Sequence, residues 1–334
     1  MMDFRTKQRI VWLRDSFAVL QVPDAVALFV NAGLSPKSEL VPDEYVDVEA
    51  VIVGLGKFGV EDARPFPNLK TVARFGAGAD NVDSRALWVA RGITATSTID
   101  LASRDVAEFA LANIIMTLRG AVRDSNALGG HPSTWRVINR TPALCDAVVG
   151  IIGAAGIGYE TARIVAPLAS GVLIFNRSKY KLDPEHFPRR NVSYADSIFD
   201  LAEQADVISI HVALNDHTRH MLDKTFFDAL RASDRSIALV NTARGEIIDE
   251  EELLKALNDK TVHDAAIDVW SAEGPRSSDI VSALRMHPSV LATSHIGSHT
   301  NGVLERYSMQ CARNVVAILA NQARDVARYI IKTD

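Results

Sequence analysis

The stretch VVGIIGAAGIGYETARIVAPLASGVLIFNRS, residues 148–178, predicts a strand, a glycine turn, a helix and a second strand. Its first residues are mostly β-branched and apolar, which is typical of a strand buried on both faces. Glycines from Gly153 to Gly158 then end the strand directly before a helical pattern. Such a turn lets the backbone approach a pyrophosphate, whose negative charge is stabilised by free N–H groups and the positive end of the helix dipole.

The glycine pattern departs from the usual G-x-G-x-x-G at one position. Ala155 stands where the second glycine is expected, and an additional glycine, Gly156, follows it. A methyl group at this position would displace a bound pyrophosphate outward, unless Gly156 compensates. A strand-to-helix turn that binds no ligand has a similar pattern, so the turn alone leaves both interpretations open. We predict that the cofactor contacts include Gly153, Ala155, Gly156, Ile157 and Gly158.

The composition is that of a globular protein. The chain has 334 residues, of which 48% are hydrophobic, enough for two domains with cores of their own. No apolar run reaches the roughly 18 residues of a membrane span, and the N-terminus lacks a signal-peptide pattern, so we expect a cytoplasmic protein without membrane contact. A net charge of -5 without basic blocks argues against nucleic-acid binding. Cys145 and Cys311 have no partners at metal-ligand spacing, so we expect no metal site.

Strands and helices are predicted to alternate along most of the chain. Apolar runs rich in β-branched residues predict further strands over residues 10–15, 47–56, 70–75, 93–98, 207–212, 237–242, 265–270 and 290–295. Longer periodic segments predict helices at 104–123 and about 300–320, and the segment VARYI near the C-terminus suggests a short additional strand. The alternation predicts the α/β class, with two domains that each contain a parallel sheet and flanking helices.

A second glycine turn, Gly76-Ala77-Gly78, follows the predicted strand at 70–75. It is either a tight connection to the next helix or a nest of backbone N–H groups that holds a carboxylate. The turn by itself does not decide between the two.

Three polar residues lie at or shortly after the ends of predicted strands, where a doubly wound sheet places its ligands: Arg244, Glu273 and His295. Arginine offers a charged planar fork to a carboxylate or carbonyl oxygen, and histidine exchanges a proton near neutral pH. A neighbouring glutamate favours the protonated form of a histidine, which suits a proton donor for carbonyl reduction. Each residue alone has a simpler interpretation as a loop or strand-end side chain, but the three together favour an active site.

The motifs together resemble those of the D-isomer-specific 2-hydroxyacid dehydrogenases over nearly the whole chain. The matching segments are ARFGAGADNVD, VAEFAL, VVGIIG, SIHVAL with Thr218, VNTARGEIIDEEELLKAL, AAIDVW with Glu273, and TSHIGSHT. The spacing from Arg244 to Glu273 and on to His295 is also similar to that of the family. The resemblance implies a flavodoxin-like substrate domain, residues 1–103 and 297–334, and a Rossmann-type cofactor domain, residues 104–296.

For the reaction, the resemblance implies that Arg244 orients a 2-oxo acid such as glyoxylate or hydroxypyruvate. His295 would donate a proton to the carbonyl oxygen and Glu273 would tune His295, while a nicotinamide delivers hydride to C2. Backbone N–H groups around Gly76, Ala77 and Gly78 would hold the substrate carboxylate. The resemblance also implies a homodimer formed through the helix at 104–123 and the segment after it. We further assign Thr242 and Asp268 to the cofactor site.

The residues after the second strand of the central unit predict which nicotinamide cofactor is used. An NAD-specific site has an acidic residue there, which accepts hydrogen bonds from the ribose and repels a 2′-phosphate. This chain has Asn176, Arg177, Ser178 and Lys179 instead, which can receive a phosphate with two cations and a hydroxyl. We therefore predict a preference for NADP(H), with NAD(H) possible.

A second function remains open, in which a protein of this fold senses a dinucleotide without significant turnover, as related transcriptional corepressors do. The set Arg244, Glu273 and His295 argues against it, because a sensor does not need a proton donor.

Overall fold

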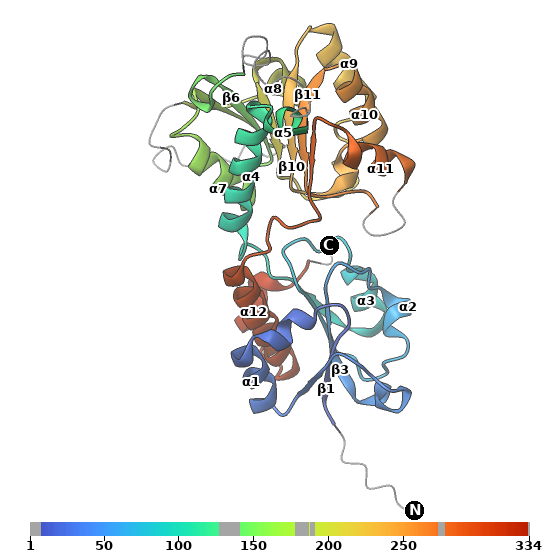
Figure 1. The fold of residues 1–334 in the computed structure, drawn as a ribbon. Helices are drawn as coiled ribbons and strands as arrows, with labels where there is room; N and C mark the ends of the chain where they lie inside the picture. The colour runs from blue at the N-terminus through green and yellow to red at the C-terminus, as the bar shows by residue number, and fades with distance from the viewer. Residues whose placement is uncertain (1–7, 127–140, 178–186, 188–190, 273–277, 333–334) are drawn as a thin grey trace, which may run out of the picture. The chain divides into compact units, whose positions relative to one another are not determined.

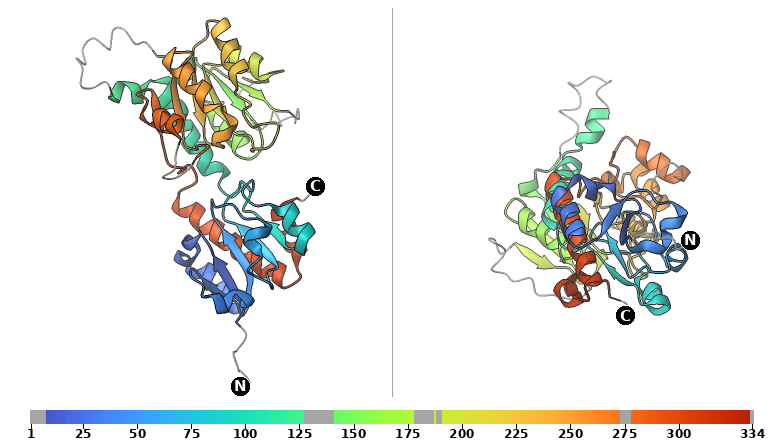
Figure 2. Two further views of the ribbon diagram at one scale, coloured as in Figure 1. Left: turned by 90° about the vertical axis from the view of Figure 1, so that its right-hand side faces the viewer. Right: turned by 90° about the horizontal axis from the view of Figure 1, so that it is seen from below.

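A computed structural model describes residues 8–126, 141–177, 187, 191–272 and 278–332. The chain separates into two compact units, residues 1–102 with 299–334, and residues 103–298. In each unit a parallel sheet carries helices on both faces (Figures 1 and 2). The predicted α/β class with two parallel sheets is therefore confirmed. Among the described residues, no helix is both long and apolar enough to cross a membrane.

The first unit contains a five-stranded sheet with the order β2-β1-β3-β4-β5. Its strands are β1 Ile10–Leu13, β2 Ser35–Lys37, β3 Val48–Val53, β4 Thr71–Arg74 and β5 Thr94–Thr96. Helices α1 (Pro23–Asn31) and α12 (Asn301–Leu319) pack on one face of this sheet, around Phe29, Cys311 and Val315. Helices α2 (Val60–Ala63) and α3 (Ser84–Arg91) cover the other face. All strands run parallel, so their carboxyl ends lie at one edge of the sheet.

The second unit contains a seven-stranded sheet with the order β12-β11-β10-β9-β6-β7-β8. Its strands are β6 Val148–Ile152, β7 Gly171–Phe175, β8 Val192–Tyr194, β9 Val207–Ile210, β10 Ile237–Asn241, β11 Val262–Ile267 and β12 Val290–Ala292. The strand order reverses between β6 and β9, and ligands of doubly wound sheets bind at the carboxyl ends beside such a reversal.

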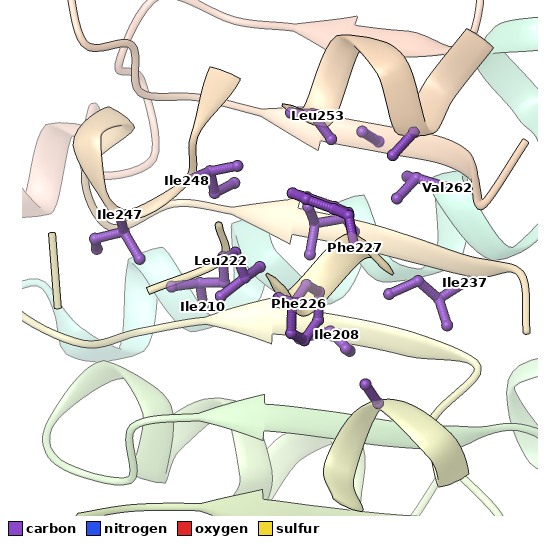
Figure 3. Packing of buried hydrophobic residues seen from close by; sticks show 14 of the residues in the cluster. Ile208, Ile210, Leu222, Phe226, Phe227, Ile237, Ile247, Ile248, Leu253 and Val262 are labelled. Atoms are coloured by element: carbon purple, nitrogen blue, oxygen red, sulfur yellow. The ribbon is translucent and has the colours of Figure 1, made fainter. Parts of the chain in front are cut away.

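Helices cover both faces of this second sheet. They are α4 Ser103–Leu118, α5 Ala121–Asn126, α7 Ile157–Val165, α8 Ile198–Gln204, α9 Lys224–Ala232, α10 Glu250–Asn258 and α11 Asp279–Met286. Helices α4 and α7 pack on one face, and α8 to α11 pack on the other. Figure 3 shows the core between this sheet and helices α8 to α11. In it, Phe226 and Phe227 of α9 lie against Ile208 and Ile237 of the strands. The strands and helices of this unit are thus fixed to one another by buried apolar side chains.

The structure differs from the sequence prediction at four elements. The helix predicted at 104–123 is broken at Gly120, which has a positive φ of 58° and separates α4 from α5. This left-handed conformation favours glycine, so the helix ends where glycine is the preferred residue. VARYI does not form a strand: it belongs to a 3-10 helix, Ala323–Tyr329, and only Ile330 makes an isolated bridge. The edge strands β2 and β8 were not predicted, because each has three residues without an apolar run.

Candidate active site

The glycine turn between β6 and α7 is closed by direct backbone contact. A Cβ on Gly158 would lie 1.8 Å from the carbonyl oxygen of Gly153, and a Cβ on Gly153 would lie 2.7 Å from Val212 Cγ1. Gly153 has φ of +93°, and its N–H donates to Phe175 O at 2.8 Å. The backbone at these two positions leaves no room for side chains, as a turn that admits a pyrophosphate requires.

The unusual pair Ala155-Gly156 has a conformational explanation. Gly156 is the N-cap of α7, with φ 44° and ψ -102°, a backbone conformation that L-residues rarely adopt. Ala155 is exposed and is not among the residues with positive φ. In this turn, glycine is therefore required at position 156 and not at 155. The altered motif therefore keeps a glycine at the position where the backbone needs one.

The residues after β7 provide no acidic side chain at the positions that are described. Asn176 is half-buried directly after the strand, and Arg177 is exposed beside it. Ser178, the third residue of the predicted phosphate site, lies outside the described residues.

The turn after β10 holds Arg244 by hydrogen bonds within the turn. The Asn241 amide donates to Arg244 O at 2.8 Å and accepts from Ala243 N at 3.0 Å. The guanidinium of Arg244 is partly exposed and donates to Ala243 O at 2.7 Å. Thr242 is buried, and within the described part of the chain its hydroxyl has no hydrogen-bond partner. Arg244 is thus presented at the carboxyl end of a central strand.

The loop that carries His295 is fastened to Asp268, which follows β11. The buried carboxylate of Asp268 accepts hydrogen bonds from Thr293 Oγ1 at 2.6 Å, from Ile296 N at 2.9 Å and from Gly297 N at 2.9 Å. His295 N donates to Asp268 O at 2.8 Å. Asp268 is among the residues predicted to contact the cofactor, and in the described part of the chain its carboxylate accepts from the loop that carries His295.

The backbone of His295 is itself unusual. Its φ is +58°, a left-handed conformation that is uncommon for residues other than glycine. Such conformations persist where surrounding contacts fix them, and they cluster at functional sites. The Asp268 contacts fix the backbone beside His295, and this backbone carries the half-buried imidazole.

The adjacency of β10, β11 and β12 brings these segments to one edge of the sheet. Because the strands are parallel, Arg244, Trp270 and His295 all follow carboxyl ends of neighbouring strands. Glu273 belongs to residues 273–277, which lie outside the described residues.

The glycine turn of the first unit lies at the carboxyl end of β4 and rests on a buried arginine. Gly76 has φ of +142°, and a Cβ there would lie 2.2 Å from Arg74 Nη1. Arg74 Nε donates to Asn81 Oδ1 at 3.0 Å, and Gly76 N donates to Thr98 Oγ1 at 2.9 Å. Sequence reasoning selected Gly76, Ala77 and Gly78 but missed the side chains that hold the turn. The polar residues Arg74 and Asn81 inside ARFGAGADNVD are the part of the sequence that could have indicated these supporting side chains.

A cavity of about 400 Å³ in the first unit lies away from the glycine turn at Gly76. It is lined by residues of α1, α12 and the 3-10 helix at 323–329, including Leu28, Arg313 and Tyr329. None of the predicted site residues lines it. Within the described ranges, no group of three or more His, Cys, Asp or Glu side chains is placed to hold a metal ion.

His211 follows β9 and packs against the glycine turn of the second unit. A Cβ added to Gly158 would lie 3.1 Å from the Cβ of His211, and the Nε2 of His211 lies 2.9 Å from Ser209 Oγ. Part of the residue is accessible, but Nδ1 is buried without a hydrogen-bond partner among the described residues. Burial lowers the pKa of His211 from 6.5 to about 3, so the ring is neutral at pH 7.

This neutral histidine predicts a loss of stability in acid. Between pH 6.5 and about 3 the unfolded chain binds a proton at His211 that the folded chain does not bind. The free energy of unfolding should therefore fall as the pH falls, by up to about 1.4 kcal/mol per pH unit from this residue. Urea unfolding of wild type and His211→Gln at pH 7 and pH 5 measures the effect, which should be smaller in the variant.

Two comparisons isolate the contribution of His211. Asp264 acts in the opposite direction, because burial raises its pKa from 3.8 to about 6 and the folded chain gains a proton there as the pH falls. Since this contribution is present in both proteins, it cancels in the comparison. His217→Gln, a change at an exposed histidine, should retain the pH dependence of the wild type. If the free energy of unfolding of His211→Gln depended on pH as strongly as that of the wild type, the lowered pKa of His211 would be contradicted.

Comparison with known proteins identifies the family of the chain. Residues 111–297 match the family model described as D-isomer specific 2-hydroxyacid dehydrogenase, NAD binding domain. The chain is an oxidoreductase of the nicotinamide-dependent class. It belongs to the family of D-isomer-specific 2-hydroxyacid dehydrogenases, as predicted from its motifs.

Relatives of known name cover most of the chain. It is 29% identical to the glyoxylate reductase of Thermofilum pendens over 259 residues, which span 77% of this chain and 74% of the relative. It is 30% identical to the (S)-sulfolactate dehydrogenase of Chromohalobacter salexigens over 260 residues, 77% of this chain and 80% of the relative. Among solved structures, the D-lactate dehydrogenase of Aquifex aeolicus, complexed with NAD and lactic acid, shares the fold. Its TM-score is 0.80 at 21% identity, covering 96% of this chain and 98% of that one.

Proposed function

We propose that the protein reduces short 2-oxo acids to D-2-hydroxy acids, with glyoxylate and hydroxypyruvate as first substrates and NADPH preferred over NADH. The observation that carries the proposal is the placement of Arg244 and His295 after β10 and β12, the two parallel strands that flank β11. Relatives named glyoxylate reductase and hydroxypyruvate reductase support the substrate class. A solved NADPH-dependent glyoxylate/hydroxypyruvate reductase from Sinorhizobium meliloti shares the fold, with a TM-score of 0.73 at 24% identity over 94% of each chain.

Each residue has a separate role in the proposed reaction. The guanidinium of Arg244 orients the 2-oxo acid, since its planar fork matches a carboxylate or carbonyl oxygen. The imidazolium of His295 donates its proton to the carbonyl oxygen as that oxygen gains charge. Glu273 tunes His295, as in the family, and N–H groups around Gly76, Ala77 and Gly78 hold the substrate carboxylate. When bound, the nicotinamide supplies the hydride.

The cofactor residues are proposed on the same basis. Gly153, Gly156 and Gly158 shape the turn that would receive the pyrophosphate, and Ala155 and Ile157 line it. Thr242 offers a buried hydroxyl without a partner among the described residues. Asn176, Arg177 and Ser178 would surround the 2′-phosphate.

The cofactor preference is predicted to depend on Arg177. The ratio of kcat/KM for NADPH over NADH should exceed one in the wild type. Arg177→Ser should lower kcat/KM for NADPH about tenfold and leave the value for NADH nearly unchanged, because one charge-assisted contact to the phosphate is lost. Arg64→Ser, at an exposed arginine of the first unit, should change neither value. A wild-type ratio below one would contradict the preference.

A panel of 2-oxo acids separates the enzyme from the dinucleotide sensor. Oxidation of NADPH with at least one member of the panel supports the proposed reaction. Tight NADPH binding without any turnover across the panel would instead favour the sensor.

We also propose that the protein forms a homodimer through α4 and the segment that follows it. Two apolar side chains of α4, Ile115 and Met116, are 40% and 38% exposed, which suits a surface that a partner covers. Sedimentation equilibrium should give twice the mass of one chain, and a mass of one chain would refute the dimer.

A further inference from the structure

We propose that the turn Trp270-Ser271 is a positioning element that fixes the Arg244 turn and the His295 loop to one another. The inference rests on the proposed function, because it concerns residues that act on Arg244 and His295 and not on the substrate. Three sets of contacts carry it, from Gly245, from Glu250 and from the indole of Trp270.

The first contact joins the Arg244 turn to this element by backbone packing. A Cβ on Gly245 would lie 2.1 Å from Trp270 C and 2.2 Å from Ser271 N. The two backbones therefore touch directly, and Gly245 is buried between them. Any displacement of Trp270-Ser271 must move the residue next to Arg244 or open a gap beside it.

The second contact anchors the element to a helix. Glu250 is the first residue of α10, and its Oε1 accepts from Ser271 N at 2.9 Å while its Oε2 accepts from Ser271 Oγ. The segment from Gly245 to Glu250 thus contacts Ser271 at both of its ends. A carboxylate with two acceptor oxygens satisfies this pair of donors in a way that a neutral amide cannot.

The third contact reaches the His295 loop. The indole Nε1 of Trp270 donates to Thr293 O at 3.0 Å, two residues before His295. The guanidinium of Arg285 lies over the indole ring, 4.9 Å from its centroid, and Trp270 as a whole is only 4% exposed. Since the φ of His295 depends on its surroundings, a shift at Thr293 changes the direction of the imidazole.

The three contacts define distinct effects for two variants. Trp270→Phe retains an aromatic ring but removes the donor to Thr293 O, so the His295 loop should loosen. Glu250→Gln weakens the hold on Ser271, so the Arg244 turn should loosen. Because both act through Trp270-Ser271, each variant should also loosen the distant segment, which a merely local packing role would not do.

Hydrogen–deuterium exchange of the full-length protein without substrate tests the coupling independently of activity. We expect faster exchange in both segments, 243–247 and 293–297, in Trp270→Phe and in Glu250→Gln. Trp88→Phe, at a tryptophan of α3 that is 52% exposed, should leave both segments as in the wild type. Exchange that changes only in the segment nearest the substitution, or in neither segment, would overturn the proposal.

Glyoxylate reduction with NADPH gives the functional readout. Each variant should change both constants, but Trp270→Phe should chiefly lower kcat, about fivefold, and Glu250→Gln should chiefly raise KM for glyoxylate, about fivefold, as expected for one lost hydrogen bond of about 1 kcal/mol. In the double variant, the loss of kcat/KM should be smaller than the product of the two single losses, since both substitutions release the same turn. Independent, multiplicative losses would contradict the coupling. Turnover by the wild type together with normal exchange in the variants rejects this inference alone, whereas a wild type without turnover on the whole panel rejects the proposed function.

Discussion

Replacing His295 with alanine is expected to lower kcat for glyoxylate reduction by about 10²- to 10⁴-fold, the usual contribution of a positioned general acid. NADPH binding should stay close to that of the wild type. The loop around His295 is held by its backbone and by Asp268, which accepts from Ile296 N and Gly297 N, so removal of the imidazole leaves these contacts in place. Steady-state kinetics and fluorescence titration with NADPH measure the two quantities.

Two further variants test whether the loss of kcat is specific to His295. Arg244→Ala should chiefly raise KM for the 2-oxo acid, because Arg244 is proposed to orient the substrate and not to transfer a proton. His299→Ala, at an exposed histidine four residues further on, should leave kcat unchanged. An equal loss of NADPH binding in His295→Ala and Arg244→Ala would contradict both proposed roles.

Short-range patterns were sufficient to predict the frame of the protein. The run from Val148 to Ile152 is apolar and β-branched, and it forms a central strand whose end carries the glycine turn. Arg244 and His295 could be selected because carboxyl ends of parallel strands lie at one edge, whatever the loops between them do. The apolar pattern through residues 104–123 predicted one helix, because Gly120 is the only residue in it that signals the break between α4 and α5.

Contacts between distant residues could not be predicted in the same way. Asp268 is predicted to contact the cofactor because it stands at a strand end, but the sequence does not indicate that its carboxylate accepts hydrogen bonds from the loop around His295, beyond the next strand. The indole of Trp270 offers one donor that many partners could accept, and the sequence does not indicate that Thr293 O is the partner. Ala155 departs from the usual glycine motif, and the sequence does not indicate that the neighbouring Gly156 is the residue that adopts a conformation with positive φ. Such features depend on register and dihedral angles, which periodicity does not encode.

Replacing Gly158 with alanine is expected to abolish measurable NADPH binding and to lower the melting temperature. The new Cβ would lie 1.8 Å from Gly153 O and 2.9 Å from Gly153 C, and these are backbone atoms that cannot rotate away as a flexible side chain can. Either the first turn of α7 or the end of β6 must shift, and both shape the proposed pyrophosphate site. Overpacking of this kind costs typically about 1–3 kcal/mol of folding free energy.

Gly171→Ala is the matched control for this change, because it adds the same methyl group in the same unit at a glycine with ordinary surroundings. Its Cβ would meet Val148 Cγ2 at 3.7 Å and Asn191 O at 3.8 Å, which are normal contact distances. We expect near-wild-type NADPH affinity and melting temperature in Gly171→Ala, measured by fluorescence titration and calorimetry. If Gly158→Ala bound NADPH as tightly as Gly171→Ala does, the pyrophosphate could not lie against this turn. The cofactor would then have to bind elsewhere than beside Gly153.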